Sequence, residues 1–229
     1  MKRRSGPDRP RRKDLQYQEL LEAVGERGCP ICRRAEESVE DALSAILHEQ
    51  VNDAGFREEL LSSGGFCRQH AWRLVAHRDI LGTAMLYRAL LRDAGRHRQP
   101  RARCSLCRSY DRVQRSALDT FTQSLSDAAF VEKLAASDGL CDPHFEMALQ
   151  GGGDERRLRQ CQENARDRLL GQLDELIRKQ DHRFMGEPDA GERDSWLRAV
   201  NATVGIDLKA LPRRRSRKLP PAKPNSVEP

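Results

Sequence analysis

The chain has 229 residues, of which 38% are hydrophobic, 5% aromatic and 33% charged, so it is expected to fold with few large core side chains. Its net charge of +6 resides at the ends: residues 1–14 and 206–229 each carry +5, which leaves residues 15–205 at −4 and argues against a basic nucleic-acid-binding body. No stretch approaches the roughly 18 apolar residues that cross a membrane, and the N-terminus lacks the apolar segment of a signal peptide. A cytoplasmic protein with reduced cysteines is expected.

The sequence between the two ends has a helical pattern throughout, which predicts an all-α fold. Residues 1–13 and 206–229 are rich in proline and arginine and are expected to be disordered basic tails. A short helix over residues 15–24 comes first, and apolar residues then recur every three or four positions along three further helices. The expected buried faces are Ala35, Val39, Leu43, Ile46 and Leu47; Ile80, Ala84, Tyr87 and Leu91; and Leu158, Cys161, Ala165, Leu169, Leu173 and Leu176.

Two copies of one module explain the order of these helices. Cys29 and Cys32 recur as Cys104 and Cys107, and after a one-residue gap "AGFREELLSSGGFC" aligns with "AAFVEKLAASDGLC". A tandem duplication predicts a pseudo-twofold arrangement, with the third helix of each copy, near 80–94 and 154–180, in a shared core. The predicted divisions are repeat 1 over 14–95, repeat 2 over 96–180, and a linker with a short final helix around Trp196 over 181–205.

Each copy supplies a Cys-x-x-Cys pair and, after one helical hairpin, a Cys-x-x-His pair. Three thiolates and one imidazole are a tetrahedral set typical of structural zinc, in which four protein ligands close the coordination sphere. The three-residue spacing places each pair on the first turn of a helix, where the dipole favours thiolates, and glycines precede both Cys-x-x-His pairs. Comparable loop lengths favour pairing within each copy; pairing across copies, with Cys29 and Cys32 joining Cys141 and His144, is the alternative. The predicted zinc sites are Cys29, Cys32, Cys67 and His70; and Cys104, Cys107, Cys141 and His144.

Other interpretations of the cysteines and histidines are less favoured. Histidine is a less usual ligand of iron–sulfur clusters, and a thioredoxin-like dithiol at Cys29 and Cys32 lacks a βαβ context. Cys161 is expected to be a core residue, and His48 and His77, which do not recur in the second copy, are expected on the surface. Four arginines adjoin the ligands and either balance the negative charge of a zinc ion with three thiolates or are ordinary solvated side chains: Arg33, Arg68, Arg103 and Arg108.

The motifs "LLEAVGERGCPICR", "GFCRQHAW", "CSLC" and "GLCDPHF", in this order, resemble a bacterial domain-of-unknown-function family, DUF6062. The likeness covers roughly residues 15–205, including the helix with Trp196, and leaves out the two tails. It implies a helical, zinc-binding protein and brings no activity with it. Because Pro143 stands where the first copy has Gln69, the second Cys-x-x-His helix is expected to start slightly differently.

Three classes of function are compatible with these features. The preferred one is a non-enzymatic scaffold or adaptor in which two structural zinc ions pin helix starts together and a groove between the copies binds a protein partner. The second is a nucleic-acid-associated protein whose basic tails contact the phosphate backbone without reading sequence. The third is a thiol-based redox or metal sensor, which the two complete ligand sets disfavour.

Overall fold

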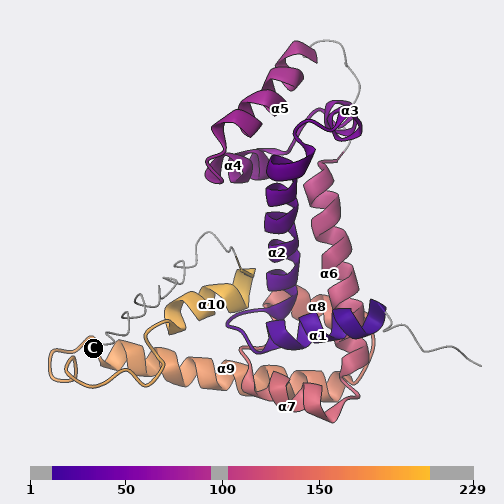
Figure 1. Ribbon diagram of the computed structural model, residues 1–229. Helices are drawn as coiled ribbons and strands as arrows, with labels where there is room; N and C mark the ends of the chain where they lie inside the picture. The colour runs from indigo at the N-terminus through magenta and orange to yellow at the C-terminus, as the bar shows by residue number, and fades with distance from the viewer. Residues whose placement is uncertain (1–11, 94–102, 207–229) are drawn as a thin grey trace, which may run out of the picture.

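Residues 12–93 and 103–206 are described by a computed structural model, and every regular element in these two ranges is a helix (Figure 1). None of these helices is long and apolar enough to cross a membrane. The all-α prediction is therefore confirmed. The elements are α1 (Arg12–Val24), α2 (Pro30–Ala45), the π-helical turn η1 (Ile46–Gln50), α3 (Ala54–Ser62), α4 (Arg68–Ala76), α5 (Ile80–Asp93), α6 (Ser105–Ser124), α7 (Ala128–Ala136), α8 (Asp142–Gln150), α9 (Glu155–Arg178) and α10 (Ser195–Val204).

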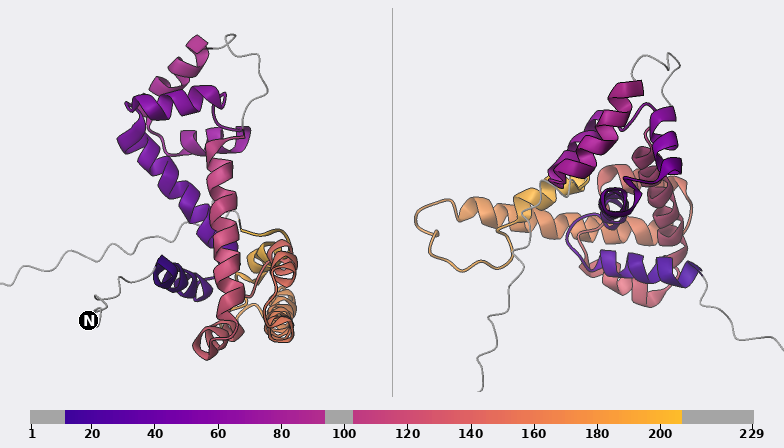
Figure 2. Two further views of the ribbon diagram at one scale, coloured as in Figure 1. Left: turned by 90° about the vertical axis from the view of Figure 1, so that its right-hand side faces the viewer. Right: turned by 45° about the horizontal axis from the view of Figure 1, so that its top comes forward.

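The long helices α2 and α6 lie antiparallel at the centre of the molecule and share its largest helix–helix contact (Figures 1 and 2). The 16 residues of α2 continue into the five of η1, and α6 has 20 residues. At about 1.5 Å per residue, each of these helical segments is about 30 Å long. The start of each helix therefore lies beside the end of the other.

Each end of this helix pair carries its own hydrophobic core. The α8 lobe, formed by α1 and α7–α10, surrounds Phe121 and Phe130, which are fully buried in edge-to-face contact with ring centroids 5.4 Å apart. The α4 lobe, formed by α3–α5, packs around Leu43, Leu74 and Leu86. Figure 1 shows the two lobes at opposite ends of α2 and α6.

The duplicated module is visible in the structure as the series α2–α5 followed by α6–α9. Asp53 and Asp127 cap α3 and α7 by accepting hydrogen bonds from Phe56 N (2.6 Å) and Ala129 N (3.0 Å). The one-residue gap between the copies falls at η1, whereas α6 stays α-helical to Ser124. A π-helical turn is how an α-helix accommodates one additional residue, so the extra residue of copy 1 is absorbed inside its long helix.

The third helices of the two copies do not share a core, contrary to the prediction. α5 belongs to the α4 lobe and α9 to the α8 lobe, at opposite ends of the molecule (Figures 1 and 2). The expected buried face of α5 is also wrong, because Ile80 and Leu91 are 84% and 74% exposed while Leu86 is buried. Apolar residues lie all around α5, so their spacing alone did not identify the inner face. In α9 the predicted Leu158, Cys161 and Ala165 are buried.

The two predicted basic tails, 1–13 and 206–229, lie outside the described residues except at their inner edges, where α1 begins at residue 12 and Ile206 is buried. The predicted final helix is α10, which packs on α8 and α9. Its buried side is polar, and Trp196 is 55% exposed. Arg198 anchors the helix through ion pairs with Asp138 at 3.5 Å and with Asp194 at 2.8 Å.

Candidate metal centres

The eight predicted ligands form two groups, and each group combines one pair from each copy. Site 1 consists of Cys29 and Cys32 with Cys141 and His144, and site 2 consists of Cys67 and His70 with Cys104 and Cys107. In each site the four ligand atoms all lie within 4.8 Å of one another. The preferred within-copy pairing is therefore wrong, and the cross-copy alternative describes the structure.

The length of the central helices explains this pairing. In copy 1, α2 and η1 carry the chain about 30 Å away from Cys29, and the nine-residue α3 brings it back by at most about 13 Å. Cys67 consequently lies near the far end of α2, beside Cys104 at the start of the antiparallel α6. Comparable loop lengths favoured the wrong partner because most of the intervening residues are in one straight helix.

All four ligand pairs stand on the first turn of a helix, as predicted. The N-cap residues of α2, α4, α6 and α8 are the first cysteine of each pair, and the second ligand follows three residues later. Free backbone N–H groups at these positions favour thiolates, as those of Gln69 and His70 do for Cys67. Pro143 does not change where its helix starts, because α8 begins directly after Cys141 just as α4 begins directly after Cys67.

The backbone before Cys141 is fixed by the neighbouring helix α9. Gly139 has a φ of 74°, and a Cβ added there would lie 2.8 Å from Gln162 Oε1. The Gln162 amide accepts a hydrogen bond from Leu140 N (3.0 Å) and donates one to Leu140 O (2.7 Å). Glycine thus allows both the sharp turn and the close approach of α9 that position the Cys-x-x-His pair.

The distances within both sites suit a single tetrahedral metal ion. The Sγ atoms of Cys32 and Cys141 in site 1, and of Cys67 and Cys107 in site 2, are 3.7 Å apart. The Nδ1 atoms of His144 and His70 lie 3.1–3.4 Å and 3.2–3.6 Å from the three sulfurs of their sites. A zinc ion bound at about 2.3 Å to sulfur and about 2.0–2.1 Å to nitrogen separates sulfurs by about 3.8 Å, and sulfur from nitrogen by about 3.6 Å. The residues present therefore fit one such ion in each site.

The protonation of site 1 also favours a cation. Burial raises the pKa of Cys29 well above its usual value, and a hydrogen bond with Cys141 together with burial raises that of Cys32 to about 12. Hydrogen bonds from these two thiols lower the pKa of Cys141. Without metal the site thus holds one thiolate between two thiols, because adjacent thiolates repel each other, and a divalent cation would displace the two remaining protons.

Site 2 has a similar but weaker asymmetry. Burial and a hydrogen bond with Cys67 raise the pKa of Cys107 to about 12. Burial also acts to raise the pKa of Cys67 and of Cys104, but hydrogen bonds outweigh it and lower both pKa values. The main hydrogen bond comes from the backbone of His70 at Cys67 and from the side chain of His70 at Cys104. A metal ion would therefore have to displace the proton of Cys107 from site 2.

Three of the four arginines beside the ligands pair with oxygen atoms. Arg33 donates to Arg27 O at 2.6 Å, Arg108 to Glu59 at 2.8 Å, and Arg103 pairs with Asp111. The charges of Arg103 and Arg108 are thus directed at a carbonyl and at carboxylates, which supports the ordinary surface role for these two, whereas the side chain of Arg33 is only 15% exposed. Arg68 is exposed.

Cys161, His48 and His77 lie where the sequence placed them. Cys161 is 6% exposed in the core of the α8 lobe. His77 Nε2 lies 3.1 Å from Glu40, His48 is exposed, and neither belongs to one of the two ligand groups.

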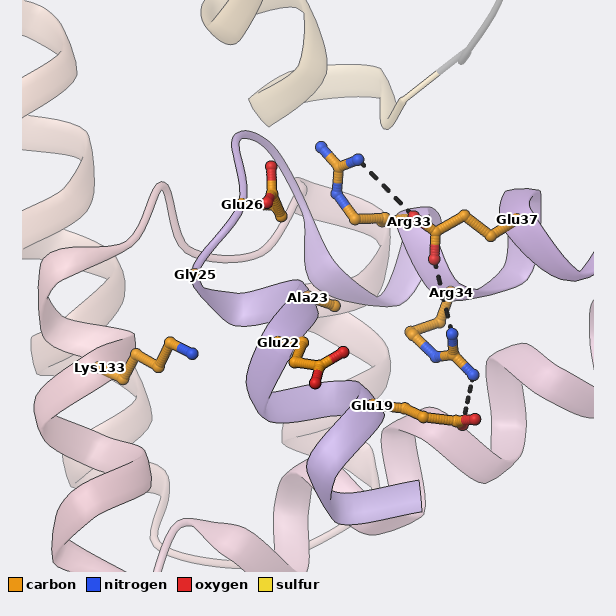
Figure 3. A pocket seen from close by; sticks show the side chains of 9 residues that line it. All are labelled: Glu19, Glu22, Ala23, Gly25, Glu26, Arg33, Arg34, Glu37 and Lys133. Atoms are coloured by element: carbon orange, nitrogen blue, oxygen red, sulfur yellow. Dashed lines mark hydrogen bonds and ion pairs between the residues drawn. The ribbon is translucent and has the colours of Figure 1, made fainter. Parts of the chain in front are cut away.

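A polar hollow of about 700 Å³ lies between α1, α2 and α7 (Figure 3). Figure 3 shows Arg34 between Glu19 and Glu37, at 2.5 Å and 3.5 Å, with Lys133 reaching toward Gly25 from the opposite wall. These charges neutralise one another, and the lining contains none of the eight ligands. The hollow is therefore separate from the metal sites.

The segment that closes site 1 was not predicted from the sequence. Gly205 ends α10 with a φ of 90°, and a Cβ added there would lie 2.9 Å from Cys32 Sγ and 3.7 Å from Cys141 Sγ. The backbone of Ile206 favours the Cys32 thiolate, and its side chain lies against Gly28. Because Ile206 stood at the edge of a predicted tail, the glycine before it was the only local signal of a close contact.

The comparisons with known proteins agree with this architecture. The profile of the Family of unknown function (DUF6062) matches residues 14–98, which include copy 1, and residues 91–210, which include copy 2 together with α10. The "Uncharacterized 23.9 kDa protein in xynA 3'region" of Caldicellulosiruptor sp. (strain Rt8B.4) is 24% identical over 206 residues, covering 81% of this chain and 99% of that protein. No solved structure matches. With both halves matched in sequence, the chain belongs to the DUF6062 family.

Proposed function

We propose that this protein is a non-enzymatic scaffold whose two halves are held together by two structural zinc ions. The observation that carries the proposal is the pair of Cys3His groups, each of which joins a helix start of one copy to a helix start of the other. Four protein ligands close a tetrahedral ion and leave no position for a substrate, which supports a structural role. A bound zinc ion would supply the positive charge that lets three thiolates lie side by side.

The compactness of both ligand groups favours zinc over an iron–sulfur cluster. A cluster distributes its cysteines over two or more irons, so some of its ligand sulfurs lie further apart than the ligands of one ion. Here all four ligand atoms of each site lie within 4.8 Å of one another. A mixed set of three thiolates and one imidazole in tetrahedral arrangement is typical of zinc.

Zinc binding and folding are expected to be coupled in this scaffold. The two sites tie α8 to the start of α2 and α4 to the start of α6, so they hold both ends of the central helix pair. Structural zinc contributes apparent binding free energies of about 10–16 kcal/mol in small domains, which would supplement the few large core side chains. Trp72, Ile80 and Leu81 are 67%, 84% and 72% exposed, which favours a protein over a nucleic acid as the partner of the scaffold.

Native mass spectrometry and elemental analysis of the full-length protein, purified without chelator, test the metal content. The expected result is two zinc ions per chain, with one retained after His70→Ala or His144→Ala. Cys161→Ala is the matched control, because Cys161 is a buried cysteine outside both sites and its replacement should leave two zinc ions. Iron, or fewer than two metal ions in the wild-type protein, would contradict the proposal.

Double variants distinguish the cross-copy sites from within-copy sites. Cys32→Ser combined with His144→Ala removes two ligands of site 1, so one zinc ion should remain. Cys32→Ser combined with His70→Ala damages both sites, so neither zinc ion should be retained. Within-copy sites would give the opposite results.

A further inference from the structure

The two metal sites are built from corresponding ligands of the repeat but differ in how deeply these ligands are buried. The ligands that correspond by the repeat are Cys29 with Cys104, Cys32 with Cys107, Cys141 with Cys67, and His144 with His70. All four ligands of site 1 are buried, with exposed fractions of 2%, 3%, 1% and 5%. In site 2, Cys104 and His70 are equally buried at 6% and 4%, whereas Cys67 and Cys107 are only half-buried.

The two sulfurs that differ are the two that Gly205 covers in site 1. A Cβ at Gly205 would lie 2.9 Å from Cys32 Sγ and 3.7 Å from Cys141 Sγ, and Ile206 behind it is 6% exposed. Their counterparts in site 2 are Cys107 and Cys67. The difference in burial between the sites therefore coincides with the position of one segment of chain.

Among the residues that the structure describes, such a cover lies over site 1 only, and the arrangement of the chain agrees with this. In copy 2 the chain continues after α9 and returns through α10 to the ligands of site 1. In copy 1 only residues 94–103 separate the end of α5 from Cys104, which is itself a ligand. The segment of copy 1 at the corresponding point of the chain is therefore much shorter than the one that leads from α9 through α10 to Gly205.

We infer that site 2 is an exchangeable metal site, whose ion can be taken by a competing ligand through Cys67 and Cys107, while site 1 retains its ion. The inference rests on the proposed function, because it requires both sites to bind zinc. Ligand exchange needs an incoming donor to reach the ion as a protein sulfur leaves, and only half-buried sulfurs allow this without prior opening of the fold. Loss of this ion would release α4 from the start of α6.

Zinc release from the full-length protein, loaded with two zinc ions, tests the inference. With an excess of the chromogenic chelator 4-(2-pyridylazo)resorcinol, one zinc ion per chain should leave at least about tenfold faster than the other. Cys107→Ser should remove the fast phase and keep the slow one, whereas Cys32→Ser, the corresponding change in copy 1, should remove the slow phase and keep the fast one. These two variants are matched by their positions in the repeat.

Alkylation of the wild-type protein gives a second measurement that does not depend on the folding of a variant. The cysteine sulfur forms a bond to the methylene carbon of iodoacetamide while iodide leaves. The resulting thioether is neutral and no longer binds zinc as a thiolate does. Peptide mapping should show Cys67 and Cys107 modified before Cys32 and Cys141. Release of two zinc ions at one rate, or modification in the reverse order, would overturn the inference and leave the proposed function intact. Fewer than two zinc ions at the outset would instead refute the proposed function.

Discussion

Replacing Gly205 by alanine is expected to open site 1 and leave site 2 unchanged. The added Cβ would lie 2.9 Å from Cys32 Sγ, which is about 0.6–1.1 Å closer than an ordinary contact between non-bonded heavy atoms. Metal–ligand distances tolerate changes of only about 0.2 Å, so Cys32 cannot yield by this amount and remain a ligand. The chain after α10 must move instead, which withdraws Ile206 from the site. A side chain at a φ of 90° adds a backbone cost of about 1–3 kcal/mol.

The variant Gly152→Ala serves as a control that carries the backbone cost without the steric contact. Gly152 has a φ of 80°, but a Cβ added there would meet nothing within 4 Å. Both variants should therefore lower the midpoint of thermal unfolding through backbone strain, and Gly205→Ala should lower it further. Only Gly205→Ala should speed the release of the slowly exchanging zinc ion, by about tenfold for each 1.4 kcal/mol that the closed state loses.

The assay is zinc release to a chromogenic chelator, with thermal unfolding of the zinc-loaded protein recorded alongside. If Gly205→Ala and Gly152→Ala release both zinc ions with the rates of the wild-type protein, Gly205 does not close site 1. Acceleration of the fast phase by Gly205→Ala would also contradict this role of Gly205, because the fast phase is assigned to site 2.

Two further predictions concern pH and the ends of the chain. The zinc affinity of site 1 should rise about 100-fold per pH unit near neutrality, because the raised pKa values of Cys29 and Cys32 mean that zinc displaces two protons. Competition with a chelator between pH 6 and pH 8 measures this slope, and a zinc affinity of site 1 that does not change with pH would contradict the assignment of protons. Deleting residues 1–11 and 207–229 should leave two bound zinc ions by native mass spectrometry, because all eight ligands and Ile206 lie within the described residues; loss of either ion would show that an end of the chain supports a site.

The local chemistry of the sites could be predicted from the sequence because it depends on short-range spacing. Cysteine and histidine three residues apart, behind a glycine, require a helix start, and Cys67 and Cys141 are the N-cap residues of α4 and α8. The repeat was equally readable, and its single-residue gap proved to be the π-helical turn η1. These features depend on residues that lie no more than one or two helical turns apart.

The features that were predicted wrongly or missed depend on how far straight helices carry the chain. The number of residues between Cys32 and Cys67 says little about the distance between them, because most of those residues form one helical segment about 30 Å long. The outward face of α5 was misassigned because apolar residues such as Ile80 and Leu86 lie on both of its sides. Gly205 was missed because its contact with Cys32 joins residues at opposite ends of the chain.

The cross-copy pairing also determines what a single copy of the module can do. Each copy carries three cysteines and one histidine, which is a complete ligand set by composition, but its two ligand pairs lie at opposite ends of one long helix. One copy alone therefore cannot close a tetrahedral ion, and only an antiparallel pair of copies completes both sites. In this chain the two copies are joined end to end. The two sites therefore differ only where the chain continues differently after each copy. Copy 1 leads within ten residues into a ligand of site 2, whereas copy 2 is free to return through α10 and cover site 1. The different burial of two otherwise equivalent sites thus follows from the connectivity of the duplication itself.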